Sequence, residues 1–298
     1  MECVLPTTEL VNDLSNNLDR LPTSEMLAII NQEDAKAVAA VQAVLPHIAA
    51  AVDRIADAFR SGGRLIYIGA GTSGRLGVLD ASECLPTFGV SPEMVFGIIA
   101  GGERALTRAI EGAEDDAAAG EKSIQDADVQ SVDVVVGISA SGGAPFVRAA
   151  IAEAKRRGAM TVGIANSQNA PLCADADIPI EAVVGPEVLQ GSTRMKSGTA
   201  QKLIFNMLST GAMVRIGKTY GNRMVDVQCS NAKLIKRAQR LVADIGQIAD
   251  PAAAQTFLDA AGGSVKTAIV MARRGVDKSA ADALLRDADG FLSKVIDD

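Results

Sequence analysis

Two loops of this 298-residue chain combine glycines with hydroxyl side chains in a pattern typical of anion sites. The first is Gly69-Ala-Gly-Thr-Ser-Gly-Arg75, and the second is Ser139-Ala-Ser-Gly-Gly143. Each follows a short apolar run and leads into a helical pattern, so backbone N–H groups can converge at a helix N-terminus beside hydroxyl donors. One such loop is as often a tight turn that binds nothing, but two similar loops favour binding. The residues that we expect to bind a phosphate group are Gly71, Thr72, Ser73, Ser139 and Ser141.

The first loop also satisfies the G-x-G-x-x-G dinucleotide fingerprint, which is weak evidence by itself. That fingerprint needs an acidic residue at the end of the next strand, about 20 positions on. The next apolar run ends in Ala100-Gly101-Gly102, and the first acid after it, Glu103, comes about ten positions late. A phosphorylated small molecule is therefore favoured over NAD.

A third segment, Gln190-Gly-Ser-Thr-Arg-Met-Lys196, precedes another helical pattern. Ser192 or Thr193 is placed to cap this helix. We expect Arg194 and Lys196 in the first turn of this helix, where cations oppose the helix dipole unless they face an anion or a carboxylate. Two solvated surface charges are an equally good interpretation of the residues alone.

Carboxylates supply the remaining chemistry, in Asp80-Ala-Ser-Glu-Cys84 and in Glu111-Gly-Ala-Glu-Asp115. A carboxylate near a bound phosphosugar can serve as general acid or base, although most single acids are solvated charges. The single histidine, His47, argues against a multi-histidine metal centre, and we give it no role. The four cysteines are scattered, which fits reduced thiols rather than disulfides or a zinc site; they are Cys3, Cys84, Cys173 and Cys229.

Composition narrows the class of protein. With 29 Lys and Arg against 36 Asp and Glu, the net charge is −7, which disfavours duplex nucleic acid and anionic membranes as partners. Aromatic residues are 3% with no Trp, so base-stacking surfaces are not expected. Neither a run of about 20 apolar residues nor a secretory signal pattern is visible. We therefore expect a cytoplasmic protein that uses no nucleic acid and no membrane.

The elements expected to position these loops are those of an α/β protein. Apolar residues recur at three- and four-residue spacings from Val38 to Ile55, which predicts helices divided near Pro46. Five short apolar runs then alternate with helical patterns, which indicates a flavodoxin-like five-stranded parallel sheet with ligands at the carboxyl ends of its strands. The predicted strands are Leu65–Ile68, Met94–Ile99, Val132–Ile138, Thr161–Ile164 and Ile178–Val184.

The chain is long enough for more than one domain. We expect an N-terminal helical segment over 1–50, the sheet domain over 51–220 and a helical C-terminal subdomain over 221–298. Breaks between the C-terminal helices are predicted at Asp250-Pro251, Gly262-Gly263 and Gly275.

Several motifs together resemble the N-acetylmuramic acid 6-phosphate etherases. Besides the first glycine loop and the two acidic segments, they are Leu79-Asp80, Gly101-Gly-Glu103, Gly191–Lys202 and Asn222-Arg-Met-Val-Asp226. Leu18-Asp-Arg-Leu21 and Ile30-Asn-Gln-Glu-Asp34 fit as well, so the resemblance is collinear over roughly 8–230.

The resemblance implies a sugar isomerase (SIS) domain, which binds phosphosugars. It also implies a cytoplasmic homodimer that acts in cell-wall recycling and needs no metal and no nucleotide cofactor. It implies cleavage of the D-lactyl ether of N-acetylmuramate 6-phosphate to N-acetylglucosamine 6-phosphate and D-lactate. By resemblance, Glu83 is the acid/base that protonates the departing lactyl oxygen, and Glu114 is the second catalytic carboxylate, which handles water addition. The hydroxyls of Thr72, Ser73, Ser139 and Ser141 would hold the phosphate; a role of Arg194 and Lys196 with the substrate's anions is our own inference.

One loop departs from the pattern of the family. Members usually carry Ser-Gly-Arg-Thr-Pro-Tyr where this chain has Ser141-Gly-Gly-Ala-Pro-Phe146. This departure is the one feature that favours an alternative, a non-catalytic phosphosugar sensor like the glucokinase regulatory protein. A second alternative is an aldose–ketose isomerase on the same domain. Retention of Glu83 and Glu114 favours the etherase.

Overall fold

The computed structural model describes residues 5–227 and 232–297. The described residues divide into two compact units, one formed by residues 5–81 and 93–209 and the other by residues 82–92, 210–227 and 232–297. The predicted three-part division differs from this pair of units. The N-terminal helices belong to the sheet unit because α2 (Leu45–Arg60) packs on its strands. Residues 82–92 belong to the second unit.

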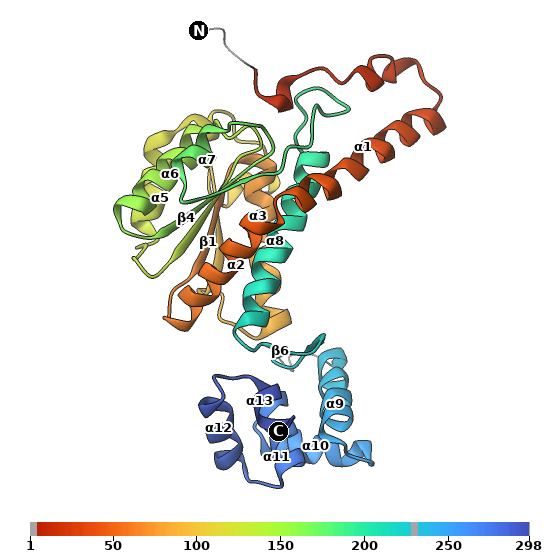
Figure 1. Ribbon diagram of the computed structural model, residues 1–298, viewed down its shortest axis with the longest axis vertical. Coiled ribbons are helices and arrows are strands. Elements are labelled where there is room, and N and C mark those ends of the chain that lie inside the picture. The colour runs from red at the N-terminus through yellow and green to blue at the C-terminus, as the bar shows by residue number, and fades with distance from the viewer. Residues whose placement is uncertain (1–4, 228–231, 298) are drawn as a thin grey trace. The chain divides into compact units, whose positions relative to one another are not determined.

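A five-stranded parallel sheet lies at the centre of the first unit (Figure 1), with the order β2-β1-β3-β4-β5. This order confirms the predicted flavodoxin-like topology. The strands are β1 (Leu65–Gly69), β2 (Val95–Ile99), β3 (Val134–Ile138), β4 (Met160–Ala165) and β5 (Ile178–Glu181). All residues of β1 and β3 are buried, as expected for strands covered on both faces.

Helices cover both faces of the sheet (Figure 1). On one face Ile66, Ile68 and Val135 pack with Phe146, Val147 and Ile151 of α6. On the other face the ring of Tyr67 lies edge-on to Phe205 of α8, with centroids 5.1 Å apart. The helices are α1 (Thr23–Ala43), α2 (Leu45–Arg60), α3 (Gly71–Phe88), α4 (Arg104–Thr107), α5 (Ala117–Asp126), α6 (Pro145–Arg156), α7 (Pro171–Asp175) and α8 (Lys196–Arg215), with 3-10 turns η1 (Thr7–Glu9), η2 (Asp13–Ser15), η3 (Leu18–Arg20) and η4 (Ala113–Asp115).

Pro46 lies in the first turn of α2, at the predicted division of the N-terminal helical pattern. The two helices meet there at 62°. Within the described residues no single helix has the length and apolarity needed to span a membrane. The bent pair of α1 and α2 meets those criteria only when the two are taken together.

The second unit carries a short hairpin, β6 (Thr219–Tyr220) with β7 (Arg223–Met224), followed by helices. These are α9 (Ala232–Gly246), α10 (Pro251–Ala260), α11 (Val265–Arg274), α12 (Lys278–Asp287) and α13 (Leu292–Ile296). Their boundaries confirm all three predicted breaks. Val242, Ile269 and Leu292 belong to a separate apolar core. Asp226 pairs with the buried Lys266 at 2.7 Å, which ties the segment after the hairpin to α11.

Cys84 and Cys173 are buried in the fold and belong to no disulfide among the described residues, and burial raises the pKa of Cys173 to about 12. Cys3 and Cys229 lie outside the described residues.

Candidate functional site

A polar cavity of about 240 Å³ lies where β1 and β3 end. Gly69 pairs with Ile138 in the sheet, so the loops that follow these parallel strands begin side by side. The lining includes all five residues predicted to bind phosphate, together with Glu114: Gly71, Thr72, Ser73, Glu114, Ser139 and Ser141. The topology has therefore brought the two glycine- and hydroxyl-rich loops to one cavity.

The first loop places the start of α3 at the cavity. Gly71 has a positive φ of 52° and opens the helix directly after the strand. Thr72 and Ser73 follow in its first turn, where free N–H groups and the helix dipole favour an anion. A Cβ at Gly74 would lie 2.7 Å from the carbonyl oxygen of Gly69 and 2.7 Å from Ile99 Cγ1. Glycine at this position therefore lets α3 approach β1 closely.

We expect Gly74→Ala to lower the free energy of unfolding by about 1–3 kcal/mol, because the new methyl meets backbone that cannot yield. Gly143→Ala is the matched control, since a Cβ there would have only Ser141 Oγ nearby, at 3.5 Å. Urea unfolding of both variants checks the prediction. An unfolding midpoint of Gly74→Ala equal to that of the control would contradict the close-approach argument.

The second loop turns sharply against the segment after β4. Gly142 has a φ of 74°, and a Cβ there would lie 2.5 Å from Ala170 Cβ. Ser141 Oγ accepts a hydrogen bond from the Gly143 amide at 3.2 Å. Ala144, which stands where the family pattern has Thr, lines the cavity, whereas Gly143, which stands where the pattern has Arg, is exposed and does not line it.

Glu114 lies in η4, and its exposed side chain lines the cavity. The segment leading to η4 is held by Arg75 of α3, which donates hydrogen bonds to the carbonyl oxygens of Leu106 (3.2 Å) and Arg108 (3.1 Å). One turn of α3 therefore supplies hydroxyls to the cavity and anchors the loop that carries Glu114.

Glu83 lies on the part of α3 that belongs to the second unit, and its side chain is exposed. It is absent from the described lining of the cavity.

Lys196 is buried, and its Nζ lies 2.6 Å from Glu33 Oε2 of α1. Lys196 thus faces a carboxylate. The sequence had suggested either an anion or a carboxylate as the partner of a cation at this position. Arg194 is exposed in the turn before α8 and is not part of the cavity lining. The start of α8 is capped by Glu187 rather than by Ser192 or Thr193, because its Oε1 accepts hydrogen bonds from the amide (2.9 Å) and the hydroxyl (2.7 Å) of Ser197.

The Glu33 carboxylate is a buried charge with several donors. Burial raises its pKa, but hydrogen bonds from Lys196, Lys36 and Asn12 outweigh burial and lower the pKa to about 2. Asn12 also donates to the carbonyl oxygen of Pro186 at 3.0 Å. This network fastens the N-terminal segment to α1, to α8 and to the loop before α8.

The sequence interpretation missed Thr8 and Glu9, which also line the cavity. It singled out the segment that contains Gly191 and Thr193, and the structure places both of these residues in the same lining. Gln190 Nε2 donates to the carbonyl oxygen of Glu9 at 2.8 Å, so η1 lies against the loop before α8. The Thr8 hydroxyl is buried and has no hydrogen-bond partner among the described residues. No local pattern marks Thr8 and Glu9, because their place at the cavity depends on a fold that joins positions more than a hundred residues apart.

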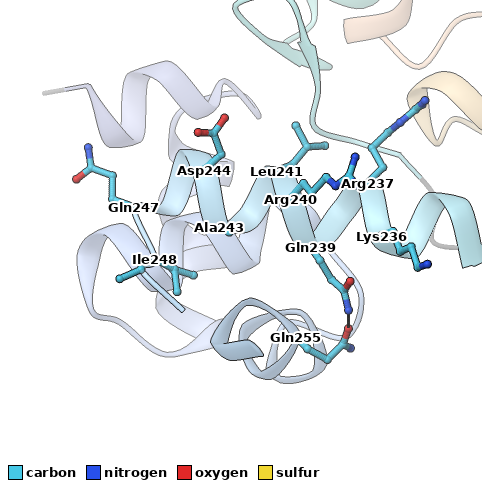
Figure 2. Close-up of a pocket in the computed structure, with 11 residues that line it drawn as sticks. Lys236, Arg237, Gln239, Arg240, Leu241, Ala243, Asp244, Gln247, Ile248 and Gln255 are labelled. Atoms are coloured by element: carbon cyan, nitrogen blue, oxygen red, sulfur yellow. Dashed lines mark hydrogen bonds between the residues drawn. The ribbon is translucent and has the colours of Figure 1, made fainter. Parts of the chain in front are cut away.

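A larger hollow of about 1170 Å³ lies on α9 and α10 of the second unit (Figure 2). Lys236, Arg237 and Arg240 lie along one side of it, and Gln239 donates to Gln255 at 2.6 Å. It contains none of the residues that the sequence predicted. Within residues 5–227 and 232–297, no cluster of three or more His, Cys, Asp or Glu side chains could hold a metal ion.

Comparison with protein families finds two overlapping domain matches. Residues 47–155 match the glucokinase regulatory protein N-terminal SIS domain, and residues 116–210 match the SIS domain. A solved phosphoheptose isomerase from Francisella tularensis is similar in fold, with a TM-score of 0.50 and 17% identity over 64% of this chain and 98% of its own.

Curated relatives are similar over nearly the whole chain. An N-acetylmuramic acid 6-phosphate etherase of Aeromonas hydrophila subsp. hydrophila is 52% identical over 96% of this chain and 96% of its own length. An N-acetylmuramic acid 6-phosphate etherase of Glaesserella parasuis serovar 5 is 54% identical over 96% of this chain and 94% of its own.

Proposed function

Because this chain belongs to the N-acetylmuramic acid 6-phosphate etherase family, we propose that it cleaves the D-lactyl ether of N-acetylmuramate 6-phosphate. The products are N-acetylglucosamine 6-phosphate and D-lactate, and the setting is amino-sugar catabolism and cell-wall recycling. The observation that carries the proposal is identity of 52% over 96% of the chain to a named etherase.

The chemistry avoids direct hydrolysis of an ether, whose alkoxide is a poor leaving group. In the open-chain sugar the C1 aldehyde acidifies the proton on C2. A base removes that proton, and lactate leaves from C3 as its oxygen is protonated. Water then adds to the resulting C2–C3 double bond. The reaction needs a base, an acid for the leaving oxygen and a group that positions water.

The polar cavity is suited to the 6-phosphate. Thr72 and Ser73 at the start of α3 and Ser139 and Ser141 after β3 supply hydroxyl donors around one space. The N-terminus of α3 adds backbone donors and a favourable dipole. The described lining contains no Lys or Arg, so binding there rests on hydroxyl and amide donors.

We assign the acid–base roles to two carboxylates. Glu83 is the acid/base that protonates the departing lactyl oxygen, and Glu114, which lines the cavity, directs water addition. We assign Lys196 a structural role rather than a contact with the substrate. Its ion pair with Glu33 helps to hold the N-terminal segment, which contributes to the lining of the cavity. Arg194 is exposed and remains available to the substrate's anions at the surface.

The proposal includes a cytoplasmic location and a homodimer. We choose a dimer because twofold dimers are the commonest closed assembly. Sedimentation of the purified protein tests this part, and a monomer at working concentrations would contradict it.

Incubation with N-acetylmuramate 6-phosphate and assay of D-lactate tests the function directly. We expect equal amounts of D-lactate and N-acetylglucosamine 6-phosphate. Tight binding of the substrate without lactate release would contradict the etherase function and indicate a phosphosugar sensor instead. Conversion of an aldose phosphate to a ketose phosphate without lactate release would indicate an isomerase.

A further inference from the structure

A second cavity, of about 200 Å³, lies beside the phosphate cavity. The two share Ala70, Gly71 and Glu114 in their linings. Glu114 therefore borders both cavities. The proposed substrate also has two parts, a phosphosugar and a lactyl group joined through the ether oxygen.

The second cavity differs in chemistry from the first. Its lining is largely small and apolar, with Ala100, Ala105, Ala109, Ile110 and Ala113. It also contains Arg75, a cation that the phosphate cavity lacks within its described lining. Arg75 uses Nε and Nη2 to hold the carbonyl oxygens of Leu106 and Arg108, and a guanidinium has five N–H donors in all.

A lactyl group carries a methyl and a carboxylate on one carbon. Alanine side chains suit the methyl, and a guanidinium suits the carboxylate. We propose that the second cavity binds the lactyl group of the substrate, with Arg75 facing its carboxylate and Ala105 and Ala109 facing its methyl. This inference rests on the proposed function and adds the subsite that selects the leaving group.

The arrangement explains why one turn of α3 carries so many polar residues. Thr72 and Ser73 line the phosphate cavity, and Arg75 follows two residues later in the lactyl cavity. The same arginine fixes the segment that leads to Glu114. Phosphate binding, leaving-group binding and placement of the carboxylate are thereby coupled in one element.

Ala109→Leu tests the subsite without touching the phosphate loops, because Ala109 is exposed and lines only the second cavity. We expect kcat/KM for N-acetylmuramate 6-phosphate to fall at least tenfold as the larger side chain fills the space. Binding of N-acetylglucosamine 6-phosphate, which lacks the lactyl group, should stay within about twofold of the wild type by calorimetry. Ala118→Leu, an exposed alanine of α5 outside both linings, is the matched control and should leave both quantities unchanged.

Glu111→Gln should strengthen binding of the lactyl substrate, whereas Ala109→Leu should weaken it. Glu111 also lines the second cavity, and its carboxylate would repel that of the lactyl group. Its neutralisation should lower KM for the lactyl substrate about two- to threefold and leave binding of N-acetylglucosamine 6-phosphate unchanged.

Three outcomes would overturn the inference while lactate release by the wild type left the proposed function intact. Equal weakening of both ligands by Ala109→Leu would assign the cavity to the acetamido group, which both ligands carry. Unchanged kinetics in Ala109→Leu would show that no part of the substrate enters it. A KM raised by Glu111→Gln would contradict a carboxylate as the bound group. Failure of the proposed function would be evident separately, as a wild-type protein that releases no lactate.

Discussion

Glu114→Gln should form N-acetylglucosamine 6-phosphate at least about 100-fold more slowly than the wild type, within the 10²–10⁴ range of general acid–base catalysis. The substitution keeps the size of the side chain that lines both cavities but removes its ability to exchange a proton. Product formation at saturating substrate, followed by mass spectrometry, measures the effect. If Glu114 directs only water addition, an unsaturated sugar phosphate accumulates as lactate is released.

Asp115→Asn is the matched control for this variant. Asp115 is the next residue of η4, is equally exposed, and lies outside the described linings of both cavities. It should retain activity within about twofold. A Glu114→Gln variant as active as the Asp115→Asn control would remove Glu114 from the mechanism.

Glu83→Gln completes this test, because the proposal assigns the protonation of the departing lactyl oxygen to Glu83. Lactate release itself should fall at least about 100-fold, and no unsaturated sugar should accumulate. Lactate release that persists in Glu83→Gln would transfer the acid role to another group.

Lys196→Met should produce the largest loss of stability, about 3–5 kcal/mol in the free energy of unfolding, because it leaves the buried Glu33 carboxylate without its main partner. Lys196 and Glu33 are both buried, with 2.6 Å between Nζ and Oε2. Lys36→Met removes the other cation near Glu33. The side chain of Lys36 is half exposed, so this variant should lower the free energy of unfolding by at most about 1 kcal/mol. Urea unfolding of both variants provides the comparison, and equal losses would contradict the account.

The pH dependence of stability follows from the same pair. The folded-state pKa of Glu33 is lowered from 4.5 to about 2, so the unfolded chain takes up a proton on this group first as pH falls. The stabilisation is therefore fully present above about pH 4.5 and is lost as pH falls through about 2. As pH falls from about 4.5 to about 2, the free energy of unfolding should decrease less in Lys196→Met than in the wild type. In this variant Glu33 no longer has the hydrogen-bond donor that lowers its pKa most.

Periodicity and composition were sufficient to predict the sheet. Nine of the ten strand ends were placed within two residues, and the strand order confirmed the expected topology. The least accurate end was that of β5, which stops at Glu181, whereas the apolar pattern continued to Val184. The apolar pattern continues there because Ala182 and Val184 are buried beyond the last paired residue of the strand.

The hydroxyl loops could be predicted because each one is a local pattern at a strand–helix junction. Their meeting in one cavity followed from the adjacency of β1 and β3. Lys196 could not be interpreted in the same way, since its partner Glu33 lies 163 residues away and only the fold brings the two together. Thr8 and Glu9 were missed for the same reason.

The Gly143-Ala144 departure has a limited structural effect. Gly143 is exposed and Ala144 is one of the residues around the phosphate cavity, while Ser139, Ser141 and the first loop are all in place. The cavity therefore keeps the hydroxyls that the proposed phosphate site needs, and both an enzyme and a phosphosugar sensor would need them.

The most direct test of the central claim is turnover of N-acetylmuramate 6-phosphate in water enriched in heavy oxygen. Both products are then weighed by mass spectrometry. Elimination followed by water addition predicts one labelled oxygen at C3 of N-acetylglucosamine 6-phosphate and none in the ether-derived hydroxyl of D-lactate. Label in that hydroxyl of lactate, or no lactate at all, would contradict the account.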